Sequence, residues 1–277
     1  FNSRPLPLFL EAQVHALKVE EDRSVAARLH RNLMKSDLVD KKLKMFSVSA
    51  SLEKEPYEIG RTKTFNPGWL ENQSIWLHME YKYMLELLKA GLYGDYYKNL
   101  KGVLIPFLKP EVYGRSIFEN SSFIAGSVHP DKRVHGQGFY ARLSGSTAEF
   151  VHMWLIMMTG GKPFALDANG KLVFSLSPVL KGDMFLKKDR KVAYYSPGGE
   201  LRKETVRKGT LKFMLLGSIP VTYVNPGRKD ILGGSKEAKY ALTLEDDSVK
   251  EFDGVVPEPY SALIRERKIK EIKIYLG

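Results

Sequence analysis

The sequence predicts a multidomain α and β protein, in which a helical part is followed by an all-β part. Before Gly160, several long segments carry apolar residues at the spacing of three or four that is typical of helices. After Gly161, short runs alternate apolar and polar residues between turn signals such as Asn-Gly and Pro-Gly-Gly. We therefore expect a helical domain at residues 1–160 and a β domain at residues 161–277.

Three helices are expected in the first part of the chain. Residues 5–37 have apolar positions near helical spacing and two prolines that suit a first turn. Residues 69–91 show the strongest helical pattern, which Gly91 ends as a C-cap. Residues 95–104 form a shorter helix that Pro106 stops, so the last two helices should make an antiparallel hairpin.

Two other stretches have the composition of loops. Residues 38–66 read as loop with one short strand, ending at the turn signal Asn66-Pro67-Gly68. Residues 111–141 are rich in Gly, Ser, Asn and His, with aromatic residues between them. A loop of this length inside a compact domain is usually functional.

The run from Arg142 to Met158 begins with small polar residues and becomes an apolar helix. Ser146, followed three residues later by Glu149, predicts a capping box with Ser146 as N-cap. The N–H groups at a helix start are unpaired, and a Ser144-Gly145 pair lets a ligand approach them closely. This helix start is therefore a candidate anion site. A capped, buried helix without a ligand is the alternative.

The β part is expected to be a sandwich or partial barrel. A basic cluster at residues 265–270 suggests a solvated strand edge that is protected by its charges. The expected strands lie at residues 171–177, 191–195, 210–215, 219–224, 239–244 and 268–276.

Composition limits the function classes. The net charge of +11 suits nucleic acid, anionic membranes or small anions, but the basic residues are spread along the chain, so we expect no nucleic-acid partner. No apolar run reaches membrane-spanning length, so no membrane partner is expected. The absence of cysteine excludes disulfides, thiolate metal sites and cysteine nucleophiles. It fits a reducing compartment, and we expect a cytoplasmic protein.

The six histidines show no tight metal-ligand spacing, so no metal site is expected. His152 lies in an apolar helix and is expected to be a core residue. His78 follows the Asn-Pro-Gly turn in a polar stretch and could contact the same anion as Ser144–Ser146. A purely structural His78 is the alternative.

Two carboxylates in the loops, Glu71 and Glu119, could bind sugar hydroxyls or act as an acid or base. A simple hydrogen bond within the loop is the alternative. Aromatic residues crowd the same segments, and they suit either sugar stacking or a plain core. These aromatic residues are Trp69, Trp76, Tyr113, Phe123, Phe139 and Tyr140.

Two motifs resemble family 94 glycoside phosphorylases, which include cellobiose phosphorylase. The run IGRTKTFNPGWLENQSIWLH at Ile59–His78 is similar to the family pattern FNPGxxENxxIxxH, and LSGSTAEF at Leu143–Phe150 is similar to its LTGTAxW segment. The stretch from Tyr113 to Phe150 looks most like the β-1,2-oligoglucan phosphorylase branch. The resemblance covers most of residues 1–160, and the β part fits the family's C-terminal β-sandwich domain.

The resemblance implies that the helical part is the C-terminal portion of an (α/α)6 barrel, and that the reaction is a reversible, inverting phosphorolysis of a β-glucoside. A carboxylic acid protonates the leaving oxygen while phosphate attacks the anomeric carbon from the opposite face. His78, Ser144 and Gly145 match the family's phosphate contacts. Inorganic phosphate is then a co-substrate, and no cofactor is expected.

The chain departs from the family in two ways. Arg61 stands where the cellobiose enzymes have a glutamate that holds the cleaved sugar, which favours another linkage. We take Arg61, Glu71 and Glu119 as the candidate substrate-binding residues. The family's general-acid aspartate lies so far upstream that it would precede residue 1. We therefore expect no catalytic residue in this chain, and we expect a fragment or subunit of a longer enzyme, which agrees with a first residue that is not Met.

The sequence thus predicts the C-terminal portion of a phosphorylase that converts a β-glucoside or β-glucan oligosaccharide and phosphate into α-glucose 1-phosphate. The expected partners are a β-linked glucose oligosaccharide, inorganic phosphate, the N-terminal part of the same enzyme (on its own chain, if the enzyme is split) and, in a homodimer, a second copy. The alternatives are a glycoside hydrolase-like or carbohydrate-binding protein without phosphorolysis, and a non-catalytic interaction fragment.

Overall fold

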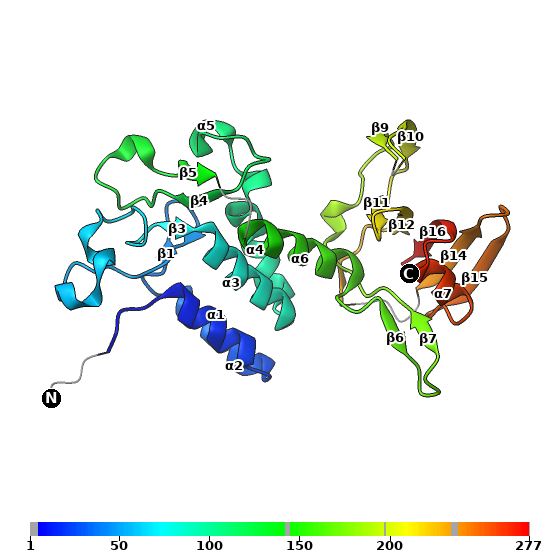
Figure 1. Ribbon diagram of the computed structural model, residues 1–277, viewed down its shortest axis with the longest axis horizontal. Helices are drawn as coiled ribbons and strands as arrows, with labels where there is room; N and C mark the ends of the chain where they lie inside the picture. Colours follow the sequence, from blue (N-terminus) through cyan, green and yellow to red (C-terminus); the bar gives the residue numbers. More distant parts are fainter. Residues whose placement is uncertain (1–4, 142–144, 197, 234–237, 277) are drawn as a thin grey trace. The chain divides into compact units, whose positions relative to one another are not determined.

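A computed structural model of the protein describes residues 5–141, 145–196, 198–233 and 238–276. It contains both helices and strands, in two compact units, Phe1–Trp154 and Leu155–Gly277 (Figure 1). The division falls inside helix α6 (Gly145–Thr159) rather than after residue 160. The described residues form no closed barrel.

The expected single helix over residues 5–37 is wrong, because the chain forms two helices there. Helix α1 (Leu10–Val19) ends at Glu20, whose backbone is extended. Helix α2 (Arg23–Leu33) begins after Asp22, whose side chain accepts a hydrogen bond from the Ser24 N–H at 2.7 Å. An aspartate at an N-cap stabilises a new helix start, and this local signal overrides the continuous apolar pattern.

Helix α3 (Leu77–Lys89) begins later than the apolar pattern predicts. Gly68, Leu70 and Gln73 have φ angles of +79°, +46° and +56°, which a right-handed helix does not allow. Residues 67–73 therefore form turns instead, and a short strand at Ile75–Trp76 precedes the helix. The end is as predicted, because Gly91 follows the helix with φ +71°.

Helix α4 (Tyr93–Val103) confirms the second helix of the predicted hairpin, and Pro106 follows in the 3-10 turn η3 (Ile105–Phe107). The segment between α2 and α3 contains two short strands that pair antiparallel, and two 3-10 turns. These elements are β1 (Val39–Asp40), β2 (Met45–Phe46), η1 (Tyr57–Ile59) and η2 (Arg61–Thr64).

Residues 111–141 are more regular than predicted. They contain two strands, β4 and β5. These pair with β3, the short strand just before α3, in a three-stranded antiparallel sheet with the order β3-β4-β5. The sheet was missed because each strand has four residues or fewer, too short for an alternating pattern. The elements are β3 (Ile75–Trp76), α5 (Pro110–Tyr113), β4 (Ser121–Ile124), η4 (Lys132–Val134) and β5 (Gly138–Ala141).

Helix α6 begins one residue before the predicted N-cap, so Ser146 lies in its first turn and the predicted capping box is wrong. The helix ends as predicted, with Gly160 and Gly161 both at positive φ. His152 is exposed, so its expected core position is also wrong. Apolar neighbours on the same side of α6, Val151 and Leu155, are exposed as well.

The second unit is built around a five-stranded sheet in the order β11-β12-β16-β14-β15 (Figure 1). A strand lies in each of the six predicted stretches. The elements are β6 (Phe164–Leu166), β7 (Leu172–Phe174), β8 (Val179–Leu180), η5 (Gly182–Met184), β9 (Arg190–Tyr195), β10 (Leu201–Val206), β11 (Thr210–Leu215), β12 (Ile219–Val224), β13 (Ile231–Leu232), β14 (Lys239–Leu244), β15 (Val249–Asp253), α7 (Tyr260–Arg265) and β16 (Ile269–Tyr275).

Strand β16 occupies the middle of this sheet, parallel to β12 and antiparallel to β14. The prediction that the basic residues near it mark a sheet edge is therefore wrong. Lys270 and Lys273 lie on the exposed face of β16, whereas Ile272 and Ile274 are fully buried in the core of the unit. The charges solvate one face of a central strand.

Candidate functional site

The structure brings together two of the predicted phosphate residues, His78 and Gly145. His78 is the second residue of α3, and Gly145 is the first residue of α6. A Cβ atom on Gly145 would lie 2.6 Å from the imidazole Cδ2 of His78. Only glycine therefore admits the ring in this position. The third predicted residue, Ser144, lies outside the described residues.

The His78 imidazole is half-buried beside charged groups. Burial lowers the pKa of His78 below its ordinary value of 6.5, and the nearby ammonium of Lys82 lowers that pKa further. The carboxylates of Glu149 and Glu11 act in the opposite direction. At neutral pH the ring is therefore uncharged, and one of its nitrogens is a hydrogen-bond donor.

The first turn of α6 adds donors beside this ring. The first N–H groups of a helix have no partner within the helix, and the helix dipole favours negative charge there. Ser146, in the same turn, is buried at 4% exposure. A neutral imidazole next to a helix start forms a site that can bind a small anion such as phosphate.

Two predicted substrate residues, Arg61 and Glu71, bind each other. The Arg61 Nη2 atom lies 2.8 Å from Glu71 Oε1, with side-chain exposures of 78% and 22%. The pair links the turn η2 to the turn region before α3. An exposed ion pair contributes little stability. It places a carboxylate and a guanidinium side by side, and both groups can form hydrogen bonds with sugar hydroxyls.

The third predicted substrate residue, Glu119, has a local partner. Its Oε1 atom accepts a hydrogen bond from Arg115 Nε at 3.0 Å, and its backbone oxygen accepts one from the Tyr113 hydroxyl at 2.8 Å. The next residue, Asn120, donates from Nδ2 to Thr147 Oγ1 at 3.2 Å. This bond fixes the Glu119 loop to the first turn of α6, a link that the sequence analysis missed.

Two of the six candidate stacking aromatics, Tyr113 and Phe123, are fully buried core residues. Phe123 is fully buried, and its ring lies 5.1 Å from Trp69 and 5.5 Å from Phe139, centroid to centroid. The Trp76 ring stacks on the Phe123 ring, with their centroids 6.1 Å apart. Tyr140, at 67% exposure, is the member most open to solvent. The plain-core alternative therefore holds for Phe123.

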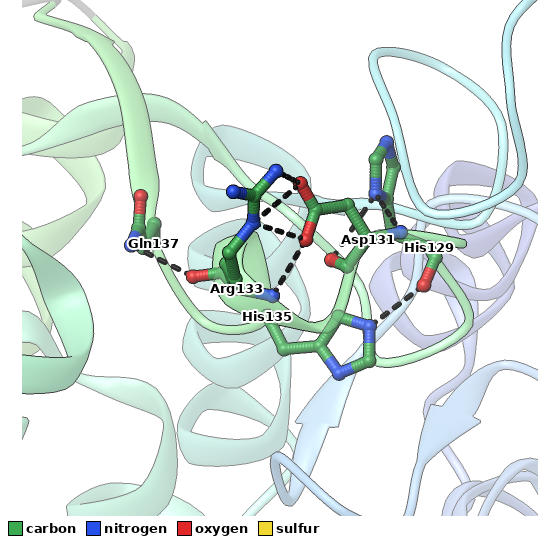
Figure 2. A network of polar contacts seen from close by, with 5 residues as sticks. All are labelled: His129, Asp131, Arg133, His135 and Gln137. Carbon is green, nitrogen blue, oxygen red and sulfur yellow. Dashed lines mark hydrogen bonds and ion pairs between the residues drawn. The ribbon is translucent and has the colours of Figure 1, made fainter.

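A polar network in the loop between β4 and β5 was not predicted (Figure 2). His135 Nε2 donates to the His129 carbonyl oxygen at 2.7 Å, which leaves Nδ1 to accept from Lys42 Nζ at 3.0 Å. Arg133 binds both carboxylate oxygens of Asp131, and these hydrogen bonds lower the pKa of Asp131 to about 2.

This network supports the Asn-Pro-Gly turn before α3. A Cβ atom on Gly68 would lie 2.7 Å from the His129 backbone nitrogen, and the Trp69 and His129 rings are 5.5 Å apart. The turn thus packs directly against the loop. The only sequence signal was the density of His, Asp and Arg between the two short strands.

Neither a metal site nor a membrane span is found within the described ranges. No three histidine, aspartate or glutamate side chains are placed there to hold a metal ion, and no helix is long and apolar enough to cross a bilayer. No known protein-family model matches the chain, and no curated protein matches it either.

Proposed function

We propose that the chain is the C-terminal portion of an inverting glycoside phosphorylase, which cleaves a β-glucoside or β-glucan oligosaccharide with inorganic phosphate. In this proposal the first unit contributes part of an (α/α)6 barrel and the second is a β-sandwich domain. The observation that carries the proposal is the close approach of the His78 ring to Gly145 at the start of α6.

The reaction assigns separate roles to this chain and to the upstream part. A carboxylic acid, expected outside this chain, gives its proton to the glycosidic oxygen as the bond from that oxygen to the anomeric carbon breaks. A phosphate oxygen forms the new bond from the opposite face and yields α-glucose 1-phosphate. Phosphate needs no general base, so the residues here have only to hold and orient it.

His78 and the α6 amides supply this binding. The neutral imidazole donates one hydrogen bond, and the N–H groups of the first turn of α6 donate others. The Arg61–Glu71 pair and Glu119 are proposed to bind the sugar, because each presents a charged group next to the elements that hold His78 and Gly145.

The test measures phosphate dependence in the complete enzyme, with the upstream part present. We expect sugar 1-phosphate to form only when phosphate is added. The change His78→Ala should raise the KM for phosphate by about tenfold or more and leave the KM for the sugar nearly unchanged. His152→Ala, which removes an exposed histidine on α6, is the matched control.

Two results would contradict the proposal. Release of free sugar without phosphate, with no sugar 1-phosphate formed, would favour a hydrolase. Equal effects of His78→Ala on the phosphate and the sugar KM would remove the phosphate-binding role of His78.

A further inference from the structure

A hollow lined by lysines lies in the first unit, between the β1–β2 connection and helix α4. Its volume is about 660 Å³, which is within the usual range for small-molecule sites. Lys41 and Lys44 line one wall, and Lys98 and Lys101 line the other. These residues share no member with the His78–Gly145 site, so the hollow is not explained by the proposed phosphorylase reaction.

The lining of this hollow is strongly unbalanced in charge. It includes four lysines and no carboxylate. Within the described part of the chain, Lys41, Lys44 and Lys98 form no ion pair with a carboxylate. Positive charges facing one another across a concave surface repel and concentrate anions from solution. These three ammonium groups therefore have no carboxylate partner among the described residues.

The lysines are presented by a fixed backbone. Lys44 has φ +60°, and its carbonyl oxygen packs so closely on α4 that a Cβ atom on Gly102 would lie 3.0 Å from it. The turn is held by Asp40, whose Oδ1 atom accepts hydrogen bonds from the N–H groups of Lys42 and Leu43 at 3.1 and 3.0 Å.

We propose that this hollow binds a small anion that carries two or more phosphate groups. Lysine ammonium groups bind phosphate oxygens as compact charges, without the planar geometry that arginine needs for carboxylates. Several lysines on facing walls match several phosphate charges better than a single one. The apolar floor, which includes Met34 and Val39, leaves room for an organic part of the ligand.

The test is calorimetric titration of the full chain with sodium triphosphate at about 50 mM salt. We expect saturable binding that weakens as salt is added, and weaker binding of inorganic phosphate. The double change Lys41→Glu with Lys44→Glu should weaken triphosphate binding by about tenfold or more. Lys98→Glu, on the opposite wall, should also weaken triphosphate binding. This single variant tests the proposal if the double variant does not fold.

The matched control is Lys187→Glu with Lys188→Glu, which makes the same change in net charge at exposed positions before β9. We expect triphosphate binding within about twofold of the wild type in this control. His78→Ala should also leave it unchanged, which separates this site from the proposed phosphate-binding site.

Four outcomes would overturn the proposal: no saturable triphosphate binding, equal weakening by the control pair, loss of binding with His78→Ala, or tight binding of a single-stranded RNA in place of triphosphate. The third outcome would assign the anion to the His78–Gly145 site instead. Failure of the phosphorylase test alone would leave this proposal standing.

Discussion

The His78 ring leaves no room for a side chain at Gly145. A methyl group there would meet the Cδ2, Cγ and Nε2 atoms of His78 at 2.6–2.7 Å. Since real Cβ atoms do not approach other atoms this closely, the imidazole must move if alanine replaces this glycine.

We expect Gly145→Ala to shift the ring resonances of His78 in NMR spectra and, in the complete enzyme, to raise the KM for phosphate by about tenfold. The free energy of unfolding should fall only slightly, because Gly145 is the first residue of α6 and the half-buried His78 ring can move. Gly94→Ala on α4, where a Cβ atom meets nothing within 4 Å, is the control. Unchanged His78 resonances would show that the close approach does not exist.

Glu80 is a buried carboxyl group beneath the first turns of α3. Its Oε1 atom accepts a hydrogen bond from the Phe46 N–H at 2.8 Å, and its Oε2 atom has no partner among the described residues. Burial raises the pKa of Glu80 well above its usual value, and the nearby Asp40 charge adds to this rise in the pKa. The folded protein therefore holds a proton here that the unfolded chain releases.

A raised carboxyl pKa makes the free energy of unfolding fall as the pH rises above about 4.5, up to the raised value. Glu80→Gln keeps an acceptor for Phe46 but does not ionise. We expect the stability of Glu80→Gln relative to wild type to increase from pH 5 to pH 8, as measured by urea unfolding. Glu53→Gln, at an exposed position, should show no such trend. A relative stability that is constant with pH would contradict a neutral Glu80.

At the scale of single residues, the sequence indicated candidate residues but not their contacts. It indicated His78 and Gly145 as candidates because a histidine and a small-residue helix start both suit anions. It could not predict that Arg61 binds Glu71, because the bond depends on how the turns η2 and 67–73 fold. Asn120 was missed since its partner, Thr147, is distant in sequence.

Among the elements, helices α2, α3 and α4 are joined by a buried polar chain. His30 Nδ1 lies 2.7 Å from the Tyr83 hydroxyl, and His30 Nε2 lies 3.7 Å from Asp95 Oδ1. Burial lowers the pKa of His30, while Asp95 acts in the opposite direction and both Lys98 and Arg31 lower the pKa further. His30 is thus neutral in the folded protein at pH 7.

A lowered histidine pKa means that the unfolded chain binds a proton first as the pH falls. The contribution of His30 to stability is complete above pH 6.5 and is lost as the pH falls from there through the lowered pKa. We expect His30→Asn to lower the free energy of unfolding at pH 7.5 by about 1–3 kcal/mol. The free energy of unfolding should also decrease less in this variant than in the wild type as the pH falls from 7.5 to 5.5.

Urea unfolding at the two pH values measures this effect. His15→Asn, which changes a histidine on the solvated side of α1, is the control. If His30→Asn kept the full pH dependence of the wild type, another group would be responsible for it.

The elements with long patterns were predicted well, and the short or interrupted ones were not. Alternating runs between turn signals located β11, β12, β14 and β16, each of which has six or more residues. The break at Asp22 and the late start of α3 depend on backbone angles that a periodic pattern does not report. The position of β16 within its sheet depends on pairing with β12, which is a tertiary property.

For the whole molecule, the second unit has its own core, which includes Phe174, Tyr240 and Ile272. The end of α6 belongs to this unit: Met158 packs on the core, and its carbonyl oxygen accepts a hydrogen bond from the Tyr223 hydroxyl at 2.5 Å. When the second unit is separated from the rest of the chain, it should therefore be more stable if α6 is kept with it.

We expect a fragment of residues 145–277 to fold by itself with a single cooperative unfolding transition in urea. A fragment of residues 161–277, which lacks α6, should have a free energy of unfolding lower by about 1–3 kcal/mol, because the packing of the half-buried Met158 and its hydrogen bond with Tyr223 are lost. Circular dichroism and urea titration measure both. An unfolded 145–277 fragment would show that the unit depends on the first one.

The central place of β16 also has a consequence for the order of folding. Without β16, the five-stranded sheet separates into the β11–β12 and β14–β15 hairpins, which have no other connection through backbone hydrogen bonds in the sheet. During synthesis these hairpins must wait, each with an apolar face in water, until residues 269–275 leave the ribosome. Parallel pairing between strands so distant in sequence is slow. The lysines of β16 should then also act before this sheet is complete, because charged side chains keep an unpaired strand from aggregating until it reaches its place.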